Sequence, residues 1–108
     1  MTTFPIMECT IRQIQQAMLE GKLTCRELTE AYLARMEAYD QQGPALNAII
    51  AVNPRALDEA DRLDQVLQET GALSGPLHGV PVLLKDNVGT CDMPTTAGSR
   101  ALEGFVPH

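Results

Sequence analysis

The stretch Val80-Pro-Val-Leu-Leu84 is followed directly by Lys85-Asp86-Asn87, and this junction decides how the rest of the chain is interpreted. A short apolar run bounded by Gly and Pro is typical of a buried strand, so residues 80–84 are predicted to be one. Pro81 has no N–H for a central ladder, which favours the start or the edge of a sheet. Because open α/β sheets usually bind ligands at the carboxyl ends of their strands, the polar residues that follow are candidate site residues.

Helix signals are well marked upstream of that run. Thr10 and Thr24 each stand three residues before a Gln or a Glu, which is the spacing of a capping box. Gly21 and Gly71 are placed to end helices. Between these signals, apolar residues recur at steps of three and four. The pattern predicts three helices, over about 11–20, 25–40 and 54–70.

The segments between and after the helices complete an α/β pattern. Residues 47–52 are an apolar run rich in β-branched residues and are predicted to be a second strand. Asn53 and Pro54 are placed as the N-cap and first residue of the third helix. Residues 88–108 are predicted to be a long loop. A loop of that length is unusual inside a self-sufficient domain.

Length and composition predict one folded domain that binds neither nucleic acid nor membrane directly. A chain of 108 residues with 44% hydrophobic and 20% charged residues fits a single folded domain. The net charge of −6, the scattered basic residues and the 4% aromatic content disfavour nucleic acid and anionic lipid. No apolar run approaches the ~20 residues that cross a bilayer. Three cysteines without a CxxC pair indicate reduced thiols in a cytoplasmic protein and no zinc site.

Lys85 is the candidate catalytic residue. At the end of a buried strand its ammonium is expected to lie partly out of water, and desolvation favours a neutral amine that can act as a base. Asp86 would oppose this effect if its carboxylate faced Lys85, although successive strand residues point to opposite faces. On the residues alone, such a pair is more often a solvated turn or a salt bridge, so both interpretations stay open here.

Two motifs favour the catalytic interpretation through their resemblance to a known family. The stretch Gly75-Pro-Leu-His-Gly-Val-Pro-Val-Leu-Leu-Lys-Asp-Asn-Val88, followed by Pro94-Thr-Thr-Ala-Gly-Ser99, resembles the opening of the catalytic domain of amidase-signature enzymes. Upstream segments also resemble the family, so the similarity spans nearly the whole chain: Thr24–Arg35, Leu46–Ala48 and Ala56–Asp61. The resemblance implies an α/β fold with N-terminal helices and the first strands of a mixed β-sheet sandwich. That fold is incomplete in this chain, and residues 1–108 form the N-terminal portion of a single domain.

The resemblance also implies a chemistry. In the family, the lysine that matches Lys85 belongs to a Ser-cisSer-Lys triad, which hydrolyses a small-molecule amide to an acid and ammonia or an amine. No cofactor and no metal are implied. The other motif residues become supporting site residues, namely Asp86, Asn87, Thr95, Thr96, Gly98 and Ser99.

The chain departs from the family pattern in its serines. Ser74 and Ser99 are the only two, and no Gly-Gly-Ser-Ser run occurs in residues 1–108. Ser99 is interpreted as a structural residue of its loop, and His78 as a turn residue. The chain is therefore expected to be inactive alone. Its end at Phe105–His108 is expected to be a cut, since the family continues there into another helix.

Two alternatives to a hydrolase remain open. One is an amidase-like subunit of a glutamine-dependent tRNA amidotransferase, and the other is a non-catalytic interaction module or a truncated relic. A homo-oligomer and a subunit of a larger complex are both compatible with the sequence. Because predicted strands lack sheet neighbours, the isolated chain is expected to expose apolar surface and to unfold with weak cooperativity or to self-associate. A sharp two-state monomer would favour the module.

Overall fold

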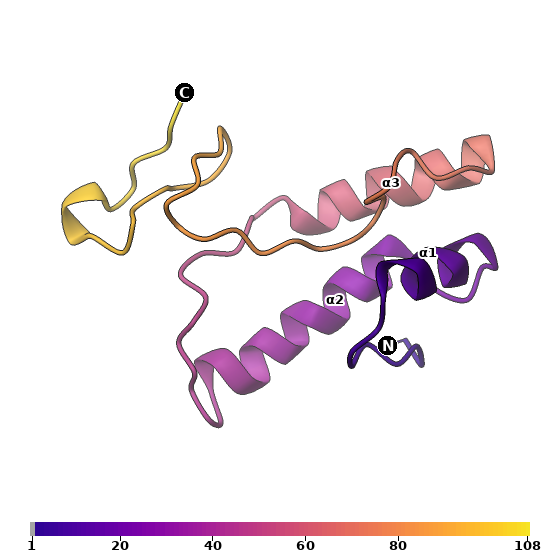
Figure 1. The fold of residues 1–108 in the computed structure, drawn as a ribbon, viewed down its shortest axis with the longest axis horizontal. Helices are drawn as coiled ribbons and strands as arrows, with labels where there is room; N and C mark the ends of the chain where they lie inside the picture. The colour runs from indigo at the N-terminus through magenta and orange to yellow at the C-terminus, as the bar shows by residue number, and fades with distance from the viewer. Residues whose placement is uncertain (1) are drawn as a thin grey trace.

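Local sequence signals set the helix boundaries in the computed structural model, which describes residues 2–108 (Figure 1). The elements are α1 (Ile11–Leu19), α2 (Cys25–Met36), the π-helix η1 (Glu37–Gln41), α3 (Ala56–Thr70) and the short 3-10 helix η2 (Arg100–Leu102). The three predicted helices are therefore present, and η1 continues α2 to the end that the sequence indicated.

The predicted helix starts of α1 and α2 are formed by the residues that the sequence singled out. The Thr10 hydroxyl accepts the Gln13 N–H at 3.1 Å, and the Gln13 side chain accepts the Thr10 N–H at 2.8 Å. Thr24 and Glu27 form the same pair at 3.0 and 2.9 Å. Each capping box satisfies backbone N–H groups that the first turn of a helix leaves free. Both predicted capping boxes are confirmed.

The start of α3 differs from the prediction. Arg55, and not Asn53, stands at the N-cap, and no side chain accepts a hydrogen bond there. The Asn53 side chain instead accepts the N–H of Arg55 at 2.9 Å, which closes an Asx turn just before the helix. Because this turn occupies the Asn53 side chain, α3 begins at Ala56. It ends as expected at Gly71, whose φ of +69° suits a residue without a Cβ.

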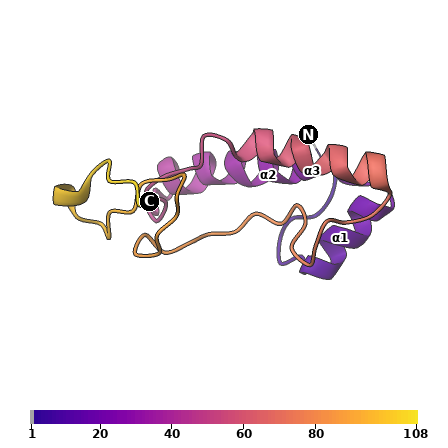
Figure 2. The same cartoon turned by 90° about the horizontal axis from the view of Figure 1, so that it is seen from above.

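The three helices pack where their apolar faces meet. Helices α2 and α3 lie side by side, and α1 lies under them together with the chain that returns from α3 (Figures 1 and 2). The buried hydrophobic residues form one cluster made of Ile14, Ala17, Met18, Leu23, Cys25, Leu28 and Ala60. Asp64 of α3 links two helices, because its carboxylate accepts the N–H groups of Cys25 and Arg26 at 2.7 and 3.1 Å. A residue of α3 thus caps α2.

The two predicted strands are absent from residues 2–108. Residues 47–52 and 80–84 run without regular structure, and within the described part of the chain no backbone N–H from 82 to 85 donates to another backbone group. A strand takes its hydrogen bonds from a neighbouring strand, and neither segment lies in a ladder with the other. Both segments are non-helical, as their apolar patterns indicated, but the structure of residues 2–108 contains neither the predicted strands nor a sheet.

The region after α3 is open and its apolar side chains face solvent. Val82, Leu83 and Leu84 are 61, 70 and 57% exposed. The Cα radius of gyration is 15.3 Å, against about 13 Å for a compact domain of this length. The expectation of exposed apolar surface is confirmed. Among residues 2–108, no helix combines the length and the apolar character that a membrane span requires.

Candidate functional site

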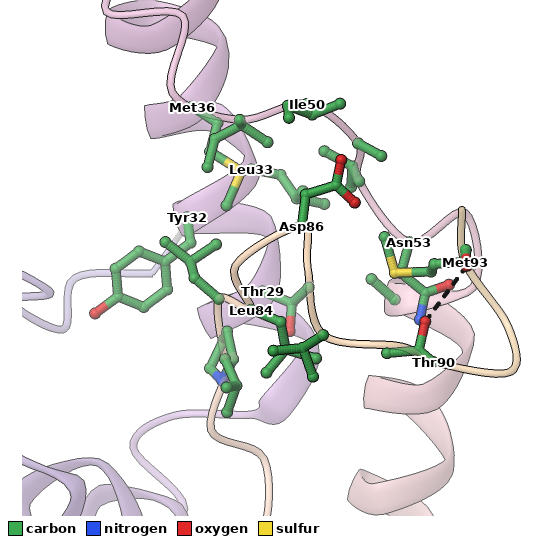
Figure 3. Close-up of a pocket in the computed structure, with 18 of the residues that line it drawn as sticks. Thr29, Tyr32, Leu33, Met36, Ile50, Asn53, Leu84, Asp86, Thr90 and Met93 are labelled. Atoms are coloured by element: carbon green, nitrogen blue, oxygen red, sulfur yellow. Dashed lines mark hydrogen bonds between the residues drawn. The ribbon is translucent and has the colours of Figure 1, made fainter. Parts of the chain in front are cut away.

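An open cavity of about 970 Å³ lies between the α2–α3 pair and the chain that carries Lys85. Figure 3 shows side chains of α2, of the segment after η1 and of the chain after α3 arranged around this hollow. Most of the lining is apolar. The charged lining residues are Glu59, Lys85 and Asp86, so Lys85 is the one cation that the described residues supply to it.

Asp86 connects the motif of residues 75–88 to the motif of residues 94–99 by hydrogen bonds. Its carboxylate accepts the backbone N–H of Thr96 at 2.9 Å and also the Thr96 hydroxyl. Its own carbonyl accepts the N–H of Ala97 at 2.8 Å. The hydroxyl and the backbone N–H of Thr96 hold the pKa of the Asp86 carboxyl below its ordinary value, because both hydrogen bonds favour the ionised form. Asp86 is therefore an anion whose hydrogen-bonding capacity is directed at the loop.

Lys85 lies beside this contact with its side chain exposed. The expectation that its ammonium is partly out of water is not met within residues 2–108, because the flanking chain supplies no cover for it. No carboxylate of the described chain lies within ion-pair distance of Lys85. Its backbone carbonyl accepts the N–H of Val88 at 2.9 Å, which turns the chain just after the motif. The amine stands at the cavity without a partner acid among these residues.

The remaining motif residues hold the loop in shape. Thr95 donates its hydroxyl to the Val88 carbonyl at 3.4 Å, and the N–H of Gly98 donates to the Thr96 hydroxyl at 3.2 Å. The Ser99 hydroxyl accepts the N–H of Ala101 at 3.3 Å and caps η2, in keeping with a structural role. Asn87 is exposed and lines the cavity. The predicted residues thus lie in two loops, residues 85–88 and 95–99, that contact each other through Asp86.

Two further titratable groups of the lining, Cys25 and Tyr32, are poor acids. Burial raises the pKa of the Cys25 thiol to about 12, and the nearby Asp64 carboxylate adds to that effect. The hydrogen-bond contact with Cys9 raises the pKa of Tyr32 to about 12, with burial as the second cause. Both side chains are therefore neutral at physiological pH, and neither is a nucleophile.

Ser74 and His78 form a contact that sequence reasoning missed. The Ser74 hydroxyl lies 2.9 Å from Nδ1 of His78, and the Ser74 backbone N–H donates to the same nitrogen at 3.0 Å. A backbone N–H can only donate, so Nδ1 carries no proton and its lone pair is already occupied. Nε2 is buried without a partner in the described chain. The pair therefore shapes a turn and does not activate the serine, which agrees with the prediction for His78.

Asp40 is a second carboxylate that local reasoning did not find. It is buried, and it accepts the N–H groups of Ala48 and Ile49 at 2.6 and 3.2 Å. This contact fixes the chain that lines one wall of the cavity. The only available signal was an Asp shortly before a Gly-Pro turn, and that signal does not name its distant partners.

Comparison with known proteins identifies the family of this chain. The sequence profile of the family described as Amidase matches residues 27–108. The chain belongs to the amidase family. A probable amidase of Arabidopsis thaliana is 46% identical over 107 residues, which cover 97% of this chain and 20% of the plant protein. A glutamyl-tRNA(Gln) amidotransferase subunit from Chloroflexus aurantiacus is 41% identical over 98 residues, 91% of this chain and 20% of that protein.

Solved amidase structures share the fold of this segment. The native peptide amidase of Stenotrophomonas maltophilia superposes with a TM-score of 0.89 at 48% identity, covering 95% of this chain and 21% of that one. A peptide amidase in complex with the competitive inhibitor chymostatin gives a TM-score of 0.90 at 48% identity, with 96 and 21% covered. The chain thus spans about a fifth of the length of the amidases it matches.

Proposed function

We propose that this chain supplies the lysine base and part of the scaffold of an amide hydrolase. The observation that supports the proposal is the position of Lys85, a cation without a partner acid in the described chain, at a cavity and next to a carboxylate that is bonded elsewhere. The membership of this chain in the amidase family also supports the proposal. The substrate class is a linear carboxylic amide, and the solved peptide amidases suggest an amide group on a peptide.

The proposed reaction follows the family triad. The neutral amine of Lys85 takes a proton from a serine held by a cis peptide bond, and that serine takes one from the nucleophilic serine. The nucleophile forms a bond to the amide carbon, and the C–N bond breaks as the nitrogen takes up a proton and leaves as ammonia or an amine. Water then cleaves the acyl ester to the acid. Both serines come from outside residues 1–108, so the chain alone is proposed to be inactive.

A chimeric enzyme tests the role of Lys85. Residues 1–108 replace the matched fifth of the Stenotrophomonas maltophilia peptide amidase, and ammonia release from a peptide amide is measured. We expect Lys85→Ala to lower kcat by about 10²–10⁴-fold, the contribution of a general base. Lys22, the other lysine of the chain, is exposed and pairs with Glu20. Lys22→Ala is therefore the matched control and is expected to retain full activity. Normal turnover by the Lys85→Ala chimera would refute the proposed function.

The second candidate function is that of an amidotransferase subunit, which the similarity to the Chloroflexus aurantiacus protein favours. A parallel graft into that protein separates the two functions. Since identity is 48% to the peptide amidase and 41% to the amidotransferase protein, we expect the hydrolase graft to keep the larger share of its host's activity. The reverse ranking would favour the amidotransferase.

A further inference from the structure

The bond between Asp86 and Thr96 has a consequence for the neighbouring amine. Asp86 and Lys85 are adjacent in sequence, and both residues line the same cavity. A free carboxylate near an ammonium can form an ion pair with it, and an opposite charge within ~4–6 Å stabilises the cation. No such pair is present in the described chain. The carboxylate is instead bonded to Thr96.

The hydrogen-bond direction at Thr96 is fixed by its other partner. The Gly98 N–H donates to the Thr96 hydroxyl oxygen at 3.2 Å, so the hydroxyl hydrogen is free to point at Asp86. The backbone N–H of Thr96 reaches the other carboxylate oxygen at 2.9 Å. Ala97, with φ +51°, bends the chain just after these two donors. Thr96 thus binds Asp86 through two atoms.

The other charged groups around the cavity do not compete for Lys85. Glu59 is the second acidic residue in the lining, and its carboxylate oxygens pair with Arg55 at 3.7 Å and Arg62 at 3.0 Å. The remaining titratable lining groups, Cys25 and Tyr32, are neutral. Asp86 is therefore the carboxylate that would form an ion pair with the Lys85 ammonium if Thr96 released it.

We propose that Thr96 is a positioning residue that binds the Asp86 carboxylate and so keeps it from pairing with Lys85. The proposal rests on the proposed function, in which Lys85 must give up its proton. An ion pair with Asp86 would hold that proton, because it stabilises the charged amine. Thr96 touches neither substrate nor the reacting atoms in this role, and it acts only through the carboxylate.

The pH dependence of kcat/KM in the peptide amidase chimera tests this role. Thr96→Val removes the hydroxyl at nearly constant volume, and it is expected to move the acidic limb of the profile upward by ~1 pH unit, the effect of one nearby carboxylate. At pH values below the limb, kcat/KM of the Thr96→Val chimera is expected to be about 10-fold lower than that of the unsubstituted chimera, as a displacement of one pH unit requires. Thr96→Ser keeps a hydroxyl and is expected to restore the limb. Thr3→Val makes the same chemical change at an exposed residue away from the cavity and is expected to change nothing.

A double variant separates this role from a merely structural one. Asp86→Asn has no charge to release, so Thr96→Val on the Asp86→Asn background is expected to leave the acidic limb in place. If Thr96→Val lowers activity equally at all pH values, or moves the limb equally on both backgrounds, the proposal is wrong. If Thr96→Val prevents folding, the Asp86→Asn variant decides, and a limb displaced upward in it overturns the proposal. Loss of the proposed function is recognised separately, by an active Lys85→Ala chimera.

Discussion

The helical region, residues 10–74, contains every buried hydrophobic residue of the core, whereas the C-terminal region, residues 75–108, contributes none. Every member of the core cluster lies between Ile14 and Ala60. The run Val82–Leu84 is more than half exposed. Helices close their hydrogen bonds within three or four residues, so the helical region contains its own partners. A strand takes its bonds from another segment. Similar apolar patterns therefore give regular structure only where the partner lies within the same chain.

Gly79 is where the two regions meet, and its substitution gives the largest expected effect. Its φ is +72°, and a Cβ there would lie 2.4 Å from Cys25 Sγ and 2.9 Å from Met18 Cε. Gly79→Ala therefore combines a left-handed backbone with overpacking, and we expect it to lower the free energy of unfolding of the helical region by about 3 kcal/mol. Urea titration followed by far-UV circular dichroism measures the change.

Two variants check the cause of that loss. Gly75 lies in the preceding turn, but a Cβ on it would meet no atom within 4 Å. Gly75→Ala is therefore expected to change stability by less than about 0.5 kcal/mol. Cys25→Ala removes the sulfur that the new Cβ meets, so the pair of substitutions is expected to cost less than the sum of the two. A harmless Gly79→Ala would show that the regions are not joined at this contact.

Asp64 tests whether the helical region also depends on distant partners. Asp64→Ala leaves the N–H groups of Cys25 and Arg26 without their acceptor, and we expect a loss of about 1–2 kcal/mol in the free energy of unfolding. Asp61 forms only an exposed ion pair with Arg26. Asp61→Ala is therefore the control, with an expected loss below about 1 kcal/mol. Equal losses from the two variants would rule out capping as the cause.

The smallest expected effect concerns the contact that orders the C-terminal loops. The folded pKa of Asp86 lies below its ordinary value of 3.8. The contact with Thr96 therefore contributes its full stability above that value and loses it as the pH falls through the lower folded pKa. We expect the amide resonance of Thr96 to titrate with an inflection below 3.8, and Thr96→Val to move it upward. An unshifted inflection would mean that the loop does not hold Asp86 in solution.

What the sequence predicts correctly divides along the same boundary. The starts of α1 and α2 and the end of α3 follow from pairs or single residues within a few positions, such as Thr24 with Glu27 and Gly71. The cap that Asp64 gives to α2 spans 39 residues, and no local pattern names such a partner. The apolar run 80–84 fits a strand by its pattern, but composition does not show whether a pairing segment is present.

The sequence named the residues of the candidate site but not the hydrogen bonds between them. Resemblance to the amidases picked out Lys85, Asp86 and Thr96, and the structure places all three around one loop pair. Side-chain alternation indicated that Asp86 turns away from Lys85, and Asp86 does bond elsewhere. The bond from Thr96 to Asp86 crosses ten residues of irregular chain, where neither a helical nor a strand period applies. The burial of Lys85 was predicted from a sheet that residues 2–108 do not form.

Because Gly79 lies close to the core, a small rotation of the chain at Gly79 displaces the residues that follow it by a larger distance. A Cβ on Gly79 would collide with Cys25 and Met18, and residues 80–85 then run without regular structure, in the part of the chain that Figure 2 shows after α3. Six residues of extended chain reach about 20 Å. A rotation of about 5° at Gly79 would move Lys85 by nearly 2 Å, several times the ~0.5 Å tolerance in the position of a catalytic group. The position of the Lys85 amine is therefore set by the contact between Asp86 and Thr96 and by the residues that flank it. The contact at Gly79 fixes only how far the chain extends from the core.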